Sequence, residues 1–105
     1  MINMSDRSVW GCVGSNGSTI YSGTGFKVDR VATGVYTILF DVPFAKWPSV
    51  VATQMFPGTM NSNGGDTRDN AVVIAISTDR FRVTTGASDG KQADRDFSFI
   101  AMGTA

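Results

Sequence analysis

The sequence offers few side chains that could carry out catalysis. Its 105 residues include no histidine, no glutamate and a single cysteine, Cys12. Histidine is the commonest general base and metal ligand, so serine–histidine, cysteine–histidine and histidine–zinc chemistry are excluded. A single cysteine forms neither an intrachain disulfide nor a zinc site. Asp94 and Asp96 are conceivable as an acid–base pair, and the alternative is that they are solubilising charges beside Arg95. We therefore predict that the protein is not an enzyme.

A polar segment between Pro57 and Asn70 is the first candidate for a binding site. It shows no strand or helix pattern, and loops of this length are usually functional or mobile. Its amide and carboxylate oxygens suit Ca²⁺ or a hydroxyl-rich ligand, and its arginine can donate to a sugar oxygen. No glutamate follows, so the spacing does not fit an EF-hand. We predict no required cofactor and leave Ca²⁺ open. The alternative is a solvated, flexible loop. The candidate ligand-binding residues here are Asn61, Asn63, Asp66, Arg68 and Asp69.

Aromatic side chains near turns are the second candidate. A sugar binds through directional hydrogen bonds and through stacking of its C–H face on an aromatic ring. Trp10, Tyr21 and Trp47 lie near turns, and Trp47 is the best placed because Lys46 and Pro48 flank it. The alternative is that both tryptophans close the ends of the fold, since large aromatic residues are highly buried on average.

The composition indicates which elements must position these residues. Hydrophobic residues make up 42% of the chain and charged residues 17%, with zero net charge. The sequence has 11 Val, 6 Ile and 7 Phe against one Leu, together with 11 Thr and 12 Gly. β-Branched and aromatic residues favour strands, and glycine favours turns. The chain is short enough for one domain, so we predict a single all-β domain over residues 1–105.

Charge and hydropathy exclude other classes. Lysines and arginines are scattered at a pI near 6.0, so no basic stripe is present for nucleic acid. No apolar run approaches the length of about 18 residues that a membrane-spanning helix needs, so we expect no membrane insertion. The first seven residues lack the apolar segment of a signal peptide, and the location stays unknown.

The pattern of turns and apolar runs predicts seven or eight short strands and no helix. Asn16-Gly17 is a strong hairpin signal. Strands spaced by about ten residues are typical of an antiparallel sandwich or barrel. We predict a flexible lead over residues 1–7. The predicted strands cover residues 8–14, 19–22, 26–31, 35–40, 49–56, 71–77, 81–85 and 96–102.

The run over residues 35–40 is apolar at nearly every position, as in a strand covered on both faces. Its even-numbered and odd-numbered residues point to opposite faces. One set belongs in the core, and the other would leave an apolar patch on a monomer, which marks an interface. We predict that Tyr36, Ile38 and Phe40 form an oligomer interface, and the alternative is a fully internal strand.

Three strings in the chain carry a family resemblance: TGFKVDRVATGVYTILFDVPFAKWPSVVAT, then DRFRVTT, then the terminal FSFIAMG. Over residues 8–103 the sequence resembles a domain that recurs in phage tail-fibre and collar proteins and in bacterial surface proteins. It is distantly similar to the C1q/TNF-like jelly roll, with Gly34-Val35-Tyr36 and Phe97-Ser98-Phe99 in corresponding order. The shared motifs concern packing. The resemblance implies a small antiparallel β-sandwich of jelly-roll type and a homotrimer that displays sites for sugars or protein receptors. The chain is shorter than a C1q head, and its 57–70 loop is outside the shared pattern.

Two functions follow as expectations. The first is a non-enzymatic recognition module that binds a carbohydrate or a cell-surface receptor, with three copies converting weak single sites into useful affinity. The alternative is a structural protein that trimerises, caps or decorates a phage fibre or virion without a ligand of its own.

Overall fold

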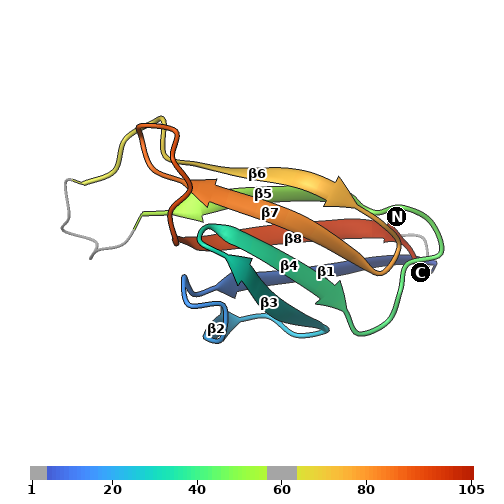
Figure 1. Ribbon diagram of the computed structural model, residues 1–105. Coiled ribbons are helices and arrows are strands. Elements are labelled where there is room, and N and C mark those ends of the chain that lie inside the picture. Colours follow the sequence, from blue (N-terminus) through green and yellow to red (C-terminus); the bar gives the residue numbers. More distant parts are fainter. Residues whose placement is uncertain (1–4, 57–63) are drawn as a thin grey trace.

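The protein is a two-layered β-sandwich in the computed structural model, which describes residues 5–56 and 64–105. These residues form eight strands and no helix. The strands build two four-stranded antiparallel sheets (Figure 1). Sheet A has the strand order β2-β1-β8-β5, and sheet B has the order β3-β4-β7-β6. The predicted all-β sandwich is confirmed, while its jelly-roll type stays a prediction. The strands are β1 (Asp6–Val13), β2 (Ile20–Ser22), β3 (Phe26–Ala32), β4 (Val35–Phe40), β5 (Ser49–Met55), β6 (Asn70–Ile76), β7 (Arg80–Gly86) and β8 (Asp96–Thr104).

The strand boundaries lie within two residues of those predicted, and the main correction concerns the N-terminus. Strand β1 begins at Asp6, so Asp6 and Arg7 do not belong to a flexible lead. The Arg7 guanidinium donates to the Val42 carbonyl at 2.6 Å and lies 4.1 Å above the centre of the Phe44 ring. These contacts fix the start of β1 to the β4–β5 connection. Residues 1–4 lie outside the described part of the chain.

The Asn-Gly pair forms the predicted turn between β1 and β2. The side-chain oxygen of Asn16 accepts hydrogen bonds from the backbone N–H groups of Ser18 and Thr19, both at 2.9 Å. Gly17 has φ 76°, in the left-handed region that glycine adopts without steric cost. The turn therefore follows directly from local sequence.

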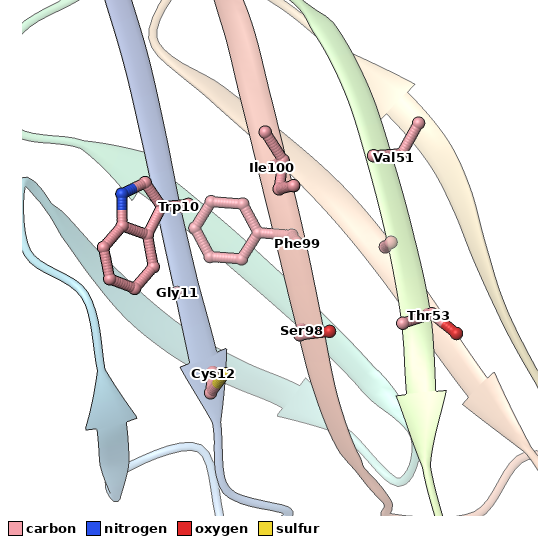
Figure 2. A pocket seen from close by; sticks show the side chains of 9 residues that line it. Trp10, Gly11, Cys12, Val51, Thr53, Ser98, Phe99 and Ile100 are labelled. Carbon is pink, nitrogen blue, oxygen red and sulfur yellow. The ribbon is translucent and has the colours of Figure 1, made fainter.

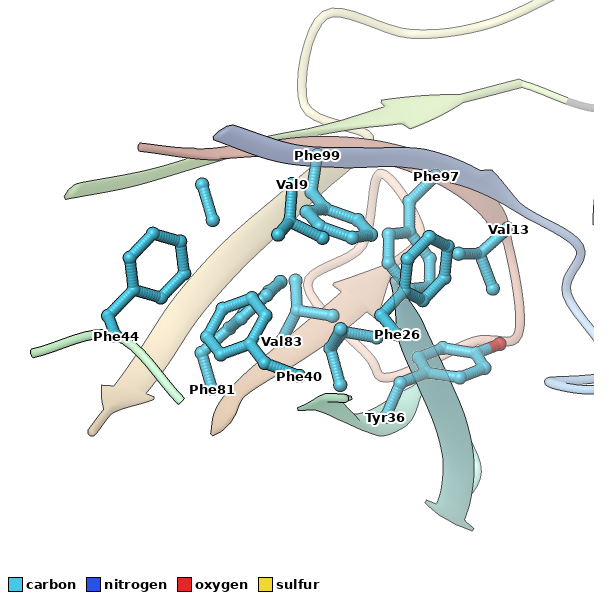
Figure 3. Close-up of a cluster of buried hydrophobic side chains, with 12 residues drawn as sticks. Val9, Val13, Phe26, Tyr36, Phe40, Phe44, Phe81, Val83, Phe97 and Phe99 are labelled. Atoms are coloured by element: carbon cyan, nitrogen blue, oxygen red, sulfur yellow. The ribbon is translucent and has the colours of Figure 1, made fainter. Parts of the chain in front are cut away.

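The core lies between the two sheets and is built mainly of aromatic rings (Figure 3). Phe99 of sheet A packs against Phe26 and Phe81 of sheet B, with ring centres 4.9 and 5.1 Å apart. Gly11 leaves room for Phe26, since a Cβ atom there would lie 2.3 Å from the ring. The buried hydrophobic residues are Val9, Val13, Phe26, Tyr36, Ile38, Phe40, Phe44, Phe81, Val83, Phe97, Phe99 and Ala101.

The predicted oligomer interface on β4 is wrong, because the same chain buries it. Tyr36 and Ile38 are 0% exposed and Phe40 is 6% exposed. In register with them on neighbouring strands lie the inward-facing residues Phe81 and Val83. Strand β4 lies in the middle of sheet B, so its even-numbered side chains complete the intrachain core and are unavailable to a second subunit.

Candidate functional site

The predicted loop residues that the structure describes form a compact turn of their own. Asp66 accepts a bidentate interaction from the guanidinium of Arg68, with Nε at 3.0 Å and Nη2 at 2.9 Å. Its Oδ1 also accepts from the backbone N–H of Arg68 at 2.9 Å. These bonds hold the pKa of the Asp66 carboxyl below its ordinary value. Asn61 and Asn63 lie outside the described residues.

The other carboxylate of this turn, Asp69, is also occupied by protein groups. Its Oδ2 accepts from the backbone N–H of Asp66 at 2.8 Å, and its Oδ1 lies 3.9 Å from Arg95 Nη2. The Arg95 guanidinium stacks over the Phe56 ring at 5.1 Å. No group of three or more acidic, Cys or His side chains in residues 5–56 and 64–105 is arranged to hold a metal ion. The geometry therefore gives no support for Ca²⁺ at Asp66 and Asp69.

A shallow groove of about 260 Å³ lies beside this turn and gathers polar groups from separate segments. Arg68 and Asn70 line it from the β6 side, and Gln92 lines it from the β7–β8 connection. The Gln92 amide donates to the Thr84 hydroxyl at 3.3 Å. Val72, 45% exposed, adds an apolar patch. Arg68 was predicted as a ligand contact and Asn70 as the end of the same polar segment, whereas Thr84 and Gln92 were missed because only the fold brings them near Arg68.

Trp47 lies at the opposite end of the sandwich. The segment around it is fixed by the bond from Phe44 N to Thr78 O at 2.8 Å and by the bond from Ala45 N to Thr104 O at 3.0 Å. Thr104 ends β8, whereas the Arg68 turn contacts Arg95 at the start of that strand. Trp47 is 73% exposed and flanks an apolar groove along β6. Trp47 and Arg68 therefore do not belong to one site.

The outer face of sheet A carries a row of exposed apolar side chains. The backbone register places Trp10, Ile100 and Val51 in one row across β1, β8 and β5. These side chains are 52%, 50% and 64% exposed. The next outward row consists of Cys12, Ser98 and Thr53. Both rows line a hollow of about 310 Å³ (Figure 2). The register places Gly11, Phe99 and Ala52 between the two rows, and these residues also line it.

The exposed position of Trp10 corrects the alternative in which both tryptophans close the ends of the fold. Trp10 points outward from the middle of β1, between the buried residues Val9 and Gly11. The alternation of β1 could have predicted this orientation, because Val9 and Val13 mark the inward face. The average burial of tryptophan was the misleading signal.

Asp94 and Asp96 do not form an acid–base pair, since each serves a different structural contact. Asp94 accepts from Arg30 Nη2 at 2.8 Å and from the Gly34 N–H at 2.7 Å. Asp96 accepts from the Ser15 N–H at 2.8 Å. The Arg30 hydrogen bond is the main cause that lowers the pKa of the Asp94 carboxyl. The two carboxylates thus fasten loops and are not simply solubilising charges.

The buried tyrosine beside this cluster also has a structural role. The Tyr36 hydroxyl donates to the Ser15 carbonyl at 2.7 Å and lies 3.3 Å from Asp94 Oδ1. Burial, reinforced by the negative charge of Asp94, raises the pKa of Tyr36 to about 12. The phenol is therefore neutral at physiological pH and ties the β1–β2 turn to β4.

Comparisons with protein families, with curated proteins and with solved structures found no match. The resemblance to phage fibre and C1q-type domains thus stays a prediction. Among the residues that the structure describes, no helix has the length and apolarity needed to cross a membrane.

Proposed function

We propose that this chain is a non-enzymatic building block that assembles with copies of itself through the outer face of sheet A. The observation that carries the proposal is the row of Trp10, Ile100 and Val51, three apolar side chains that are each at least half exposed. Met102, 56% exposed, extends this surface along β8. Contiguous apolar surface of this kind marks an interaction site on a soluble protein. The homotrimer expected from the resemblance is one assembly of this type.

Charge supports the same choice of surface. The outward positions of the three long strands of sheet A, from the row of Ser8 to the row of Cys12, hold no charged side chain. A face without charge meets its own copy without like-charge repulsion, and the cost of desolvating ionised groups does not arise. This surface therefore suits contact between identical chains better than the charged face of sheet B.

The test is the mass of the native protein in solution, measured by light scattering and sedimentation over a range of concentrations. We expect an oligomer that Ile100→Asp dissociates, because the substitution places a carboxylate at the centre of a dry contact. The matched control is Lys27→Asp, an exposed position on the outer face of sheet B, which should leave the mass unchanged. A wild-type protein that stays monomeric at every concentration would contradict the proposal.

A second function, carbohydrate recognition, is favoured by the groove beside Arg68. It combines a guanidinium oriented by Asp66 and the amides of Asn70 and Gln92 with the apolar surface of Val72. Sugars are bound by a few directional polar groups set beside apolar surface. Sites of this depth bind weakly, so display on an oligomer would raise their apparent affinity.

A glycan array probed with the native oligomer tests this second function, in calcium and again with EDTA. We expect selective binding that Gln92→Ala and Arg68→Ala abolish. Trp47→Ala, at the other end of the sandwich, should leave it intact. Loss of binding in Trp47→Ala alone would move the sugar site to Trp47, and an array without signal would reject carbohydrate recognition. Loss in EDTA would show a cation requirement.

A further inference from the structure

The outer face of sheet A has two rows of different height, side by side. Trp10, Ile100 and Val51 form one row, and Cys12, Ser98 and Thr53 form another row farther along the strands, as Figure 2 shows. The first is called the raised row and the second the low row, because the side chains of Cys12, Ser98 and Thr53 are smaller. Two rows on one face of a sheet are separated by two residues, about 6.6 Å along the strands. Residues of both rows line the hollow of about 310 Å³. One face therefore presents a row of large apolar side chains beside a hollow.

We propose that two copies pack face to face about a twofold axis that runs across the strands of sheet A, between the raised row and the low row. This inference rests on the proposed assembly through sheet A. Rotation about this axis places the raised row of each copy over the low row of the other. Ile100 then enters the hollow above Ser98 of the second copy, and the same contact recurs by symmetry. A twofold axis along the strands would instead set raised row against raised row and leave the hollows unfilled.

The contact of Ile100 with Ser98 of the second copy lies at the centre of the interface, where the crossing of the two sheets displaces residues least. Two stacked sheets cross at about 30° because each is twisted, so residues far from the axis shift relative to one another. Strand β8 lies between β1 and β5 in sheet A, which places Ile100 and Ser98 in the middle strand of the three. Trp10 over the second copy's Cys12, and Val51 over its Thr53, form the flanks of the contact.

The size of the face sets the strength of this dimer. Three strands of about eight residues, at about 3.3 Å per residue and 4.8 Å per strand, cover on the order of 400 Å². Stable interfaces bury about 800 Å² on each partner. A contact of about 400 Å² on each partner is half of that and belongs with weak, transient interfaces, so the dimer should dissociate on dilution.

The decisive experiment fills the hollow with an apolar side chain. Ser98→Leu makes the face more apolar, so an unspecific hydrophobic contact would become stronger. Packing of Ile100 into the hollow predicts the opposite, a weakening of dimerisation by about tenfold or more, measured by sedimentation equilibrium. Ser8→Leu is the matched control, since it adds the same side chain to the same face outside the hollow. We expect it to leave dimerisation intact.

A second measurement follows Cys12, which the dimer should cover. The structure leaves this free thiol partly exposed in one chain. Its alkylation should slow as the protein concentration rises, and slow less in Ser98→Leu. If Ser98→Leu does not give the β-sheet circular dichroism of the wild type, Thr53→Leu on β5 serves as the replacement.

The outcomes separate the two proposals. A trimer that Ile100→Asp dissociates, or a stronger dimer in Ser98→Leu, would overturn the twofold packing and leave assembly through sheet A standing. A protein that is monomeric throughout, or an oligomer indifferent to Ile100→Asp, would overturn both.

Discussion

The outer faces of the two sheets differ, although both sheets bury their inner faces in the same core. Across sheet A the backbone register aligns Trp10, Ile100 and Val51, and across sheet B it aligns Asp29, Thr37 and Arg82. In sheet B, Arg82 Nε donates to the Thr37 hydroxyl at 3.3 Å, so its polar groups find partners within the chain. Thr37 is only 8% exposed, whereas Trp10 is 52% exposed. The middle of the outer face of sheet B is thus polar, although Val72 and Ile74 on β6 are 45% and 52% exposed, whereas the middle of the outer face of sheet A is apolar.

The comparison shows that the inward and outward residues of each strand serve different purposes in the two sheets. In both sheets most inward residues are apolar and form the shared core, which fixes the fold. The outward residues do not affect that core, so they are free to be chosen for another purpose. A face of hydroxyls and charges keeps a sheet solvated, and an uncharged apolar face is retained at the risk of aggregation unless something covers it.

The largest expected effect comes from removing the core that both faces share. Phe99→Ala should lower the free energy of unfolding by about 3–5 kcal/mol, because Phe99 contacts Phe26 and Phe81 across the sandwich. Its neighbour Ile100 points outward, so Ile100→Ala should cost no more than about 1 kcal/mol in the monomer. Urea unfolding at a concentration below dimerisation measures both. Equal losses would show that Ile100 is not an exposed face residue.

How far sequence alone reaches is seen best on β4. Its alternation separated the even-numbered from the odd-numbered residues, and its bounds were predicted at 35–40 as observed. Both sets are largely apolar, so the strand by itself does not tell which set faces inward. The neighbouring strands show that the even-numbered set faces inward, because Phe26 pairs with Phe40 and Val83 pairs with Tyr36. The alternation of those neighbouring strands, joined to a hairpin register, would have identified the inward set.

The candidate site was less accessible to sequence reasoning. A continuous polar segment drew attention to Arg68 and ends at Asn70, but Thr84 and Gln92 reach the same groove from other parts of the chain. Likewise, Trp10, Ile100 and Val51 become one surface only through the pairing of β1 and β5 with β8. Local patterns predict strands and turns well, whereas the pairing of distant strands is what creates a site.

A smaller expected effect is a loss of folding stability at low pH, caused by protonation of Asp94. Asp94 links Arg30 and the Gly34 N–H of sheet B, and Arg30 keeps the pKa of its carboxyl below the ordinary value near 3.8. A group whose pKa is lower in the folded chain adds stability above its unfolded pKa, and this stability is lost as the pH falls through the folded pKa. Below about pH 4 the wild type should therefore lose stability.

Asp94→Ala tests this dependence. At neutral pH we expect a loss of about 1–2 kcal/mol, because the Gly34 N–H and the Arg30 guanidinium lose their acceptor in a half-exposed site. Below pH 4 the difference between variant and wild type should shrink. Urea midpoints across the acid range measure it, with Asp89→Ala on the exposed β7–β8 connection as the control. A constant difference at all pH values would mean that the ionised form of Asp94 is not what stabilises the fold.

The smallest effect concerns salt, and it separates the two faces most directly. If copies meet through sheet A, no ion pair forms on assembly, and raising the salt from about 0.05 M to 0.5 M should change the dissociation constant by no more than about twofold. Sulfate should tighten the dimer slightly, because excluded salts favour burial of apolar surface. If instead the charges of sheet B formed the contact, screening would weaken it over the same range. Sedimentation equilibrium in chloride and in sulfate measures whether the dissociation constant rises or falls with salt. A dimer that dissociates with rising salt would assign the contact to the face that bears Asp29 and Arg82, because screening weakens only a contact made by charges.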